Sequence, residues 1–249
     1  MLRPLVLFPL LCCCVCAQKD NPQQAPVVGH VQLSRYGDLL RQRGIELTEP
    51  ALVNALKSTD PSVRFLAAMK LAEDKQADTI PAIKDALDVE KNPRTYVNIA
   101  LALGLLGDPS GSTELRRVCA DGAFPPEFRL YAVRYMFDLQ FQKEEACLRA
   151  VQEIVLTDSS VSDRQSALEL LIRFKGLTES ESRYMLQLVG DRLDDPEPTI
   201  RMAAGQCLAQ LGGQEAARSL ERAITREKDA GVRSVLEKDL KKLKDIGSR

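Results

Sequence analysis

Apolar residues recur along this chain with the spacing of an amphipathic helix, and the helices that they predict come in pairs. In the first regular pair, Val63, Ala67 and Leu71 lie on one helical face, and Ile83 and Leu87 lie on another after a polar turn. The same arrangement returns several times before the chain ends. A repeated helical pair predicts an all-α stack of helix-turn-helix units that bury their apolar faces against their neighbours.

A short polar segment precedes the first helix of each pair and sets the period. In the first regular unit it reads Asp60-Pro61-Ser62-Val63-Arg64, where Asp60 is expected to cap the helix and Pro61 to occupy its first turn. The last positions of the six such segments are Arg64, Tyr96, Arg129, Arg164, Arg201 and Arg233. Separations of 32 to 37 residues between them predict about five to six repeats.

The two ends of the array depart from this pattern and are expected to act as caps. Residues 33–59 predict an irregular helical pair, the repeats fill residues 60–228, and residues 229–249 predict one helix with a lysine-rich face. A polar outer face is what the terminal unit of a repeat array needs.

The beginning of the chain has the pattern of an export signal. Arg3 precedes an apolar stretch, and Val15 and Ala17 place small residues where a signal peptidase would cleave. Residues 1–17 are therefore predicted to be a signal peptide, with an uncleaved membrane anchor as an alternative.

A lipid anchor is a further alternative, although none of the early cysteines follows Gly, Ala or Ser as a lipobox requires. Residues 18–32 contain Asn21-Pro22 and Ala25-Pro26 without a helical period, and they predict a flexible linker. No later segment approaches the roughly 20 apolar residues of a membrane-spanning helix. The mature protein is expected to be soluble and exported, in a periplasm or outside the cell.

The units resemble HEAT repeats. The resemblance covers about residues 49–243 and implies a right-handed α-solenoid. Its short 32-residue period is most similar to the bacterial HEAT-like subgroup that is also seen in phycobilin lyases. Departures from the pattern are Tyr96 at an arginine position, and Pro125-Pro126 and Ser160 at the Asp-Pro position. The segments that carry the resemblance are Asp60 to Ala68, Ile80 to Leu87, Gly104 to Pro109 and Leu208 to Gly212.

Three cysteines follow the predicted signal peptide, and they are Cys119, Cys147 and Cys207. An odd number leaves at least one thiol free or paired with another molecule. Cys119 and Cys147 fall on predicted second helices of adjacent units, so a bridge between them is one alternative. Because no Cys-x-x-Cys or other paired spacing occurs, the sequence favours three small buried apolar residues.

Charge and composition argue against several classes of function. The chain has 34 basic and 35 acidic residues and a net charge of −1, which gives no broad attraction to nucleic acid. His30 is the only histidine and lies in the predicted linker, so neither a metal site nor a histidine-based triad is expected. No glycine-rich phosphate loop is present. Catalysis, a metal and a cofactor are therefore not expected.

The recurring arginines could have either of two roles. A row of guanidinium groups at Arg64, Arg129, Arg164, Arg201 and Arg233 could bind phosphates. At the start of each first helix, however, an arginine is expected to bridge to an acidic residue or a carbonyl of the neighbouring unit. The resemblance to HEAT repeats implies the same structural role.

A partner-binding surface is expected on the second helices, which the resemblance places along the concave side of the array. Arginine predominates there, and its planar fork suits recognition surfaces; ordinary solvated positions are the alternative. Replacing Arg116, Arg117 and Arg149 with Glu is expected to abolish binding of an acidic partner without lowering the melting temperature. The candidate residues are Lys84, Arg116, Arg117, Arg149, Arg192, Arg218 and Arg222, with Asp85 and Gln152 nearby.

These observations predict an exported, non-enzymatic scaffold that binds a protein or peptide along its concave surface, because stacked units form an extended rigid surface. A lyase-like enzyme or accessory that acts on a tetrapyrrole-bearing protein is the alternative. A purely structural envelope component is a third possibility.

Overall fold

The computed structural model of the chain describes residues 35–157 and 160–247. Within these two ranges the chain forms thirteen α-helices and two short 3-10 segments, without a strand. The predicted signal peptide and the predicted linker lie outside the described residues.

The helices follow one another at short intervals. Their bounds are α1 (Arg35–Arg41), α2 (Glu49–Ala55), α3 (Pro61–Glu73), α4 (Ile80–Asp88), α5 (Pro93–Leu105), α6 (Pro109–Ala120), α7 (Pro126–Asp138), α8 (Glu145–Leu156), α9 (Val161–Leu171), α10 (Glu179–Asp191), α11 (Pro198–Leu211), α12 (Gly213–Arg226) and α13 (Ala230–Gly247), with 3-10 segments η1 (Ala77–Thr79) and η2 (Arg192–Asp194).

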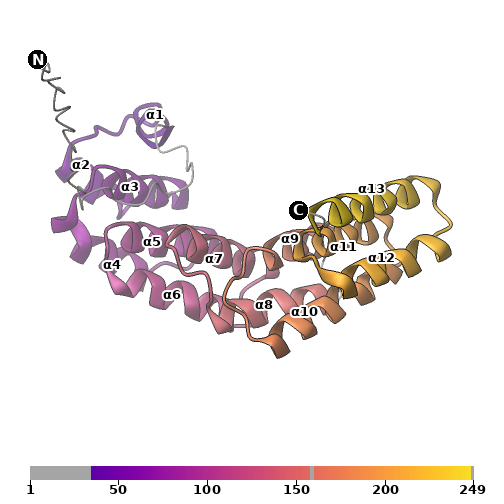
Figure 1. Ribbon diagram of the computed structural model, residues 1–249. Helices are drawn as coiled ribbons and strands as arrows, with labels where there is room; N and C mark the ends of the chain where they lie inside the picture. Colours follow the sequence, from indigo (N-terminus) through magenta and orange to yellow (C-terminus); the bar gives the residue numbers. More distant parts are fainter. Residues whose placement is uncertain (1–34, 158–159, 248–249) are drawn as a thin grey trace, which may run out of the picture.

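Five helical pairs form the repeats, and they run from α3–α4 to α11–α12. The pair α1–α2 covers the N-terminal end, and the single helix α13 packs on α11 and α12 at the other end. Figure 1 shows two layers, with the first helices of the pairs in one layer and the second helices in the other. Each unit packs mainly on its neighbours in the chain, as expected of a solenoid.

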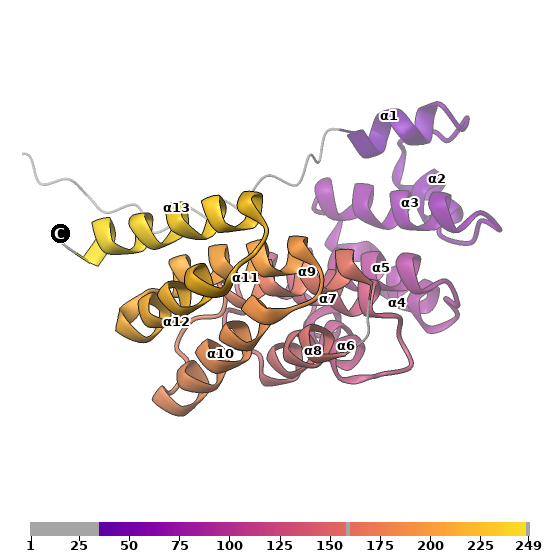
Figure 2. The same cartoon turned by 90° about the vertical axis from the view of Figure 1, so that its right-hand side faces the viewer.

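The stack bends into an arc. In Figures 1 and 2 the first helices α5, α7, α9 and α11 follow the inner side of this arc, and the second helices follow the outer side. The expectation that the second helices line the concave surface is therefore wrong. The reason lies in packing: α3 against α5 and α11 against α13 make extensive contacts, whereas α4 and α6 hardly touch. The first helices are thus more closely spaced toward the two ends of the stack, whereas at its centre α6 and α8 contact each other more than α5 and α7 do.

Local sequence explains where the first helices begin. The carboxylate of Asp60 accepts a hydrogen bond from the backbone N–H of Ser62 at 2.8 Å, and Pro61 is the first residue of α3. Asn92 caps α5 in a similar way, through the N–H of Thr95 at 3.1 Å. A side-chain acceptor followed by proline satisfies a free helix N–H and presets the first turn.

The core lies between the two layers. The predicted stripe residues Val63, Ala67, Leu71, Ile83 and Leu87 are all buried. The equivalent second-helix positions in later repeats are also buried, and they are Leu115, Leu148 and Leu220. The apolar pattern therefore places these side chains correctly.

Small residues let the helices approach closely at two points. A side chain at Gly111 of α6 would collide with the backbone of Gly104 and Ala100 of α5. A side chain at Gly205 of α11 would collide with Leu236 of α13. Both positions bring helices nearer than any larger residue allows.

Candidate functional site

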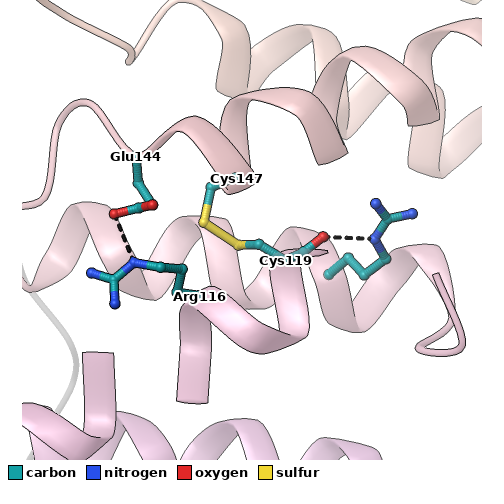
Figure 3. The surroundings of a disulfide bond; sticks show 5 residues. Arg116, Cys119, Glu144 and Cys147 are labelled. Atoms are coloured by element: carbon teal, nitrogen blue, oxygen red, sulfur yellow. Dashed lines mark hydrogen bonds and ion pairs between the residues drawn. A yellow bond between two sulfur atoms is a disulfide. The ribbon is translucent and has the colours of Figure 1, made fainter. Parts of the chain in front are cut away.

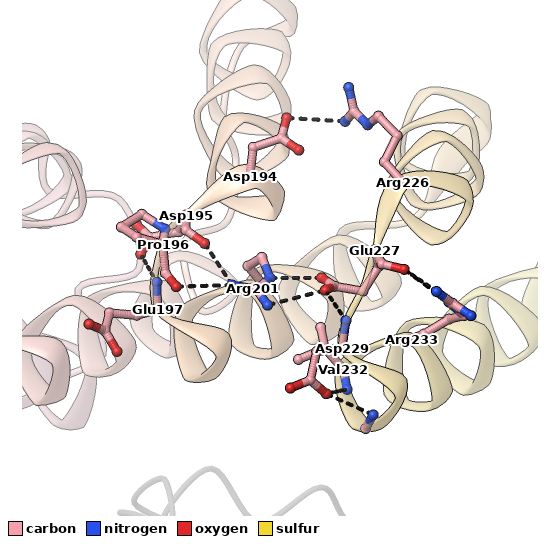
Figure 4. A network of polar contacts seen from close by, with 11 residues as sticks. Asp194, Asp195, Pro196, Glu197, Arg201, Arg226, Glu227, Asp229, Val232 and Arg233 are labelled. Atoms are coloured by element: carbon pink, nitrogen blue, oxygen red, sulfur yellow. Dashed lines mark hydrogen bonds and ion pairs between the residues drawn. The ribbon is translucent and has the colours of Figure 1, made fainter.

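The recurring arginines lie at the junctions between repeats, and Arg201 shows the arrangement in full (Figure 4). Its Nε donates to Oε2 of Glu227 at 2.7 Å, and its Nη1 donates to the carbonyl oxygen of Asp195 at 2.9 Å. Glu227 follows α12, and Asp195 precedes α11. Arg233 continues the series, since its Nε donates to the carbonyl of Glu227 at 3.1 Å. One acidic residue thus serves the arginines of two successive units.

Arg64 repeats this geometry near the other end of the array. Its Nε and Nη2 donate to the two carboxylate oxygens of Glu90 at 2.6 and 2.7 Å. Its Nη1 donates to the carbonyl of Ser58 at 2.7 Å. A fork-shaped pair of this kind combines charge with fixed geometry.

Arg129 and Arg164 make the same kind of link with fewer contacts. Arg129 donates to Glu153 at 2.8 Å and to the carbonyl of Cys119 at 3.1 Å. Arg164 donates to Asp195 at 2.5 Å. The paired arginine side chains are only 7% to 17% exposed, so they hold helices together and do not offer a row of free guanidinium groups to phosphates.

Tyr96 occupies the arginine position of the second repeat and joins a different network. Its hydroxyl donates to Glu114 and accepts a hydrogen bond from Arg117, both on α6. Burial and the hydrogen bond to Glu114 raise the pKa of Tyr96 to about 12. The residue remains a neutral donor, and it ties the two helices of its repeat without an ion pair of its own.

A disulfide joins Cys119 of α6 to Cys147 of α8, with the two Cα atoms 4.8 Å apart (Figure 3). The sequence favours separate thiols, and this expectation is wrong. The two cysteines stand at different positions in their repeats, so spacing along the chain does not reveal that neighbouring second helices bring them together. Cys207 is free and buried, and burial raises its pKa to about 12.

The predicted partner-binding residues lie on the outer layer, and the first two of them link successive second helices. Lys84 of α4 pairs with Asp108 at 2.8 Å, and Arg116 of α6 pairs with Glu144 at 3.0 Å (Figure 3). Replacing Arg116 with Glu would set two carboxylates against each other. We therefore expect that variant to melt at a lower temperature, which differs from the sequence-based expectation.

Two more of these residues pair within their own helices. Arg117 contacts Glu114 at 2.7 Å, and Arg149 contacts Glu145 at 2.5 Å. Exposed pairs of this kind contribute little to stability. They nevertheless reduce the charge that these arginines offer to a partner.

The last three predicted residues lie toward the C-terminal end. Arg192 is in η2 and donates to the carbonyl of Val155 at 3.4 Å. Arg218 is exposed on α12, and Arg222 of the same helix donates to Ser219 at 3.1 Å. Because all seven candidates belong to the outer layer, the structure does not gather them on the inner side of the arc.

The first-layer helices α1 and α7 carry aromatic side chains that are not fully buried. We call Tyr36, Phe128, Tyr131 and Tyr135 the tyrosine face; all four are partly exposed. On α7, the ring centroids of Tyr131 and Tyr135 lie 6.4 Å apart, and those of Phe128 and Tyr131 lie 6.3 Å apart. Tyr131 shares a helical face with Glu127 and Arg134, which are exposed, so this side of α7 is open to solvent.

Polar contacts fix the tyrosine face in place. The hydroxyl of Tyr135 donates to Oδ1 of Asn98 on α5 at 2.9 Å. Burial, and then the nearby hydroxyls of Tyr36 and Tyr131, raise the pKa of Tyr135 to about 12. The sequence carried a usable signal, because residues 128, 131 and 135 share a helical face that is separate from the apolar stripe.

In residues 35–157 and 160–247, no group of three or more His, Cys, Asp or Glu side chains is placed to hold a metal ion. No helix in that part of the chain is long and apolar enough to cross a membrane.

Helical pairs stacked in two layers, each packed on its neighbours, define the chain as an α-solenoid. The sequence profile of HEAT repeats matches residues 49–136 and 148–241, and the chain belongs to this family. The resemblance seen in the sequence and the all-α solenoid fold are both confirmed.

Three solved structures illustrate what the chain is similar to. A chain from the complex of CpcE and CpcF of phycocyanin lyase from Nostoc is 20% identical, with 78% of this chain and 76% of that chain covered and a TM-score of 0.46. Human deoxyhypusine hydroxylase in complex with glycerol is 17% identical, with 86% and 78% covered and a TM-score of 0.42. An engineered protein is 16% identical, with 86% and 84% covered and a TM-score of 0.33. No curated protein matches the sequence. Similarity of this degree carries no conclusion about activity.

Proposed function

We propose that this protein is an exported scaffold that binds a protein or peptide partner along the inner side of its arc, with the tyrosine face as the principal contact. The observation that carries the proposal is the gathering of Tyr36, Phe128, Tyr131 and Tyr135 on helices of the inner layer. The whole chain contains only seven Phe and five Tyr. A third of its aromatic residues therefore occupy one partly exposed surface.

Energetics favour such a surface as a binding site. Tyrosine presents a large apolar ring with a polar tip and loses little conformational freedom on binding, so it is enriched among the residues that dominate binding energy. The hydrogen bond from Tyr135 to Asn98 holds one ring in place before a partner arrives. Preorganisation of this kind lowers the entropy cost of association.

Export is the second part of the proposal. The pattern of residues 1–17 supports it, as does the disulfide between Cys119 and Cys147, because disulfides persist mainly in oxidising compartments. The partner would accordingly be found outside the cytoplasm. Fractionation of cells that express the full chain, followed by mass analysis of the mature N-terminus, tests this part; a cytoplasmic protein that retains residues 1–17 would contradict it.

The binding surface is tested by affinity capture with matched variants. The chain from Gln18 onward is immobilised and exposed to an envelope extract, alongside Tyr131→Ala and Tyr184→Ala. Tyr184 is exposed on α10 of the outer layer, so it controls for the loss of a surface tyrosine. We expect a partner that is retained by the unaltered chain and by Tyr184→Ala but not by Tyr131→Ala. Equal retention by all three chains, with melting curves that show each one folded, would reject the inner surface.

The lyase-like alternative stays a prediction from the sequence. Covalent modification or turnover of a tetrapyrrole substrate by the purified chain is the assay that decides it. Activity in that assay would replace the scaffold proposal.

A further inference from the structure

A cavity of about 790 Å³ opens between α11 and α13, at the opposite end of the array from α1. Gln206 and Gln210 line it from α11, one helical turn apart. Lysines from α13 line the other side. Both helices lie in the same layer as α7, which carries Tyr131 and Tyr135 of the tyrosine face, and α5, which carries the Asn98 contact.

The cavity has an excess of positive charge. Lys238, Lys241 and Lys242 are exposed on its wall, against the two carboxylates of Asp239 and Asp245. Among the described residues, none of the three lysines forms an ion pair. Other exposed cations such as Lys57 and Lys228 also lack an ion pair within the described ranges, but they do not line this cavity, where three lysines occur within five residues of one helix.

One carboxylate in the wall lacks the partner that its burial demands. Asp239 is only 9% exposed, and its Oδ2 has no hydrogen-bond partner within the described part of the chain. An unpaired buried acceptor destabilises the folded state, and native proteins contain few of them. This oxygen is itself buried and lies against Gly205 of α11, so it belongs to the packing between α11 and α13 and not to the open face of the cavity.

We propose that this cavity binds an acidic peptide segment of the scaffold's partner. Carboxylates of the peptide pair with Lys238 and Lys242, which are exposed on the wall. The amides of Gln206 and Gln210 each offer a donor and an acceptor, which matches a peptide backbone. A continuous row of phosphates fits less well than spaced carboxylates, since Asp239 and Asp245 interrupt the positive charge of the wall. This inference rests on the proposed binding function and adds a second contact to it.

The test uses fluorescence anisotropy with the chain from Gln18 onward. The probe is a labelled octapeptide of alternating glutamate and glycine, and its control has glutamine in place of glutamate. We expect the acidic peptide to bind, to bind more weakly as NaCl rises, and to lose affinity at least about tenfold in Lys238→Gln/Lys242→Gln. The matched variant Lys57→Gln/Lys228→Gln removes the same charge from exposed lysines outside the cavity and should bind as the unaltered chain does.

Several outcomes would overturn the inference. These are equal affinity for the glutamine peptide, unchanged affinity in the cavity variant, or tighter binding to a single-stranded oligonucleotide or to phosphatidylglycerol vesicles than to the peptide. The variant Tyr131→Ala separates the two proposals, since it should keep its affinity for the short acidic peptide while losing the captured partner. Failure of the peptide assay alone therefore leaves the scaffold proposal standing.

Discussion

Arg201 and Glu227 are 26 residues apart in sequence and form two hydrogen bonds, at 2.7 and 3.2 Å. The pair ties the start of α11 to the segment that follows α12, so it joins the two ends of one repeat. Arg64 and Glu90 have the same separation and the same two-point contact. The repeat is therefore closed by an ion pair where the next unit begins.

Breaking this pair should destabilise the fold. The Glu227 side chain is 7% exposed, and in Arg201→Met it loses its main cationic partner. We expect the free energy of unfolding in urea to fall by about 3 kcal/mol, the cost of leaving a buried charge uncompensated. Arg218→Met removes an exposed arginine and should change the free energy of unfolding by less than about 0.5 kcal/mol. Equal effects of the two substitutions would contradict this account.

The same pairs predict how stability depends on acid. The hydrogen bond from Arg201 lowers the pKa of Glu227 below its usual 4.5, and Arg129 lowers the pKa of Glu153 in the same way. The stabilisation that these two ion pairs give the folded state is complete above pH 4.5. It is lost as the pH falls through the lowered pKa values of the two glutamates. The melting temperature should therefore drop below pH 4.5, and the drop should be smaller in Arg201→Met. A melting temperature that stays constant from pH 7 to pH 3 would contradict the assignment.

The disulfide should be a large contributor to stability. Cys119 and Cys147 are 28 residues apart, and closing a loop of that length restricts the unfolded chain by about 3 to 4 kcal/mol. The double variant Cys119→Ala/Cys147→Ala should unfold at a lower urea concentration than the oxidised protein. A reductant should shift the unaltered chain toward the variant and leave the variant unchanged. A reductant effect of equal size in both would contradict this account, since the variant has no disulfide for the reductant to cleave.

Gly111 should tolerate no larger residue. A methyl group there meets backbone atoms of α5, which cannot rotate away as a side chain would. We expect Gly111→Ala to lower the free energy of unfolding by about 1 to 3 kcal/mol. Gly122→Ala is the control, because a methyl group at Gly122 meets no atom within 4 Å. Equal stabilities of the two variants, measured by thermal unfolding, would show that the helices do not approach as closely as described.

The ionised carboxylate of Asp239 should lower the free energy of unfolding at neutral pH. Burial raises its pKa, and the nearby Lys242 and Lys238 only partly oppose this. The folded state therefore loses stability as the pH rises from 3.8, the ordinary pKa of an aspartate, through the raised pKa of Asp239. Asp239→Asn should be more stable than the unaltered chain at pH 7, by about 1 kcal/mol, with a smaller gain near pH 4. A loss of stability at pH 7 would show that Asp239 has a structural partner.

Much of the fold follows from periodicity along the chain. The spacing of apolar residues places Leu71 and Ile83 in the core, and the Asp60-Pro61 signature marks the start of α3. The direction of curvature does not follow in the same way. It depends on how closely helices of successive repeats pack, which residues such as Gly205 decide through contacts about 30 residues away in sequence.

The candidate site was harder to predict because charge alone does not identify a free side chain. The i, i+4 pair of Arg149 with Glu145 can be read from sequence. The pairs of Lys84 with Asp108 and of Arg116 with Glu144 cannot, since they join helices of different repeats. Arginine-rich helices therefore indicated a binding surface where the structure has mostly internal ion pairs.

The position of the disulfide bears on how the molecule deforms under load. In a stack whose units contact only their neighbours, bending occurs at the junctions between successive units. The bond between Cys119 and Cys147 locks the joint between α6 and α8, so bending concentrates at the joints on either side, where the outer helices make few contacts. In the proposed scaffold, bending at the C-terminal joint would change the distance from Tyr131 to Lys238, and with it the length of partner that could contact both surfaces at once.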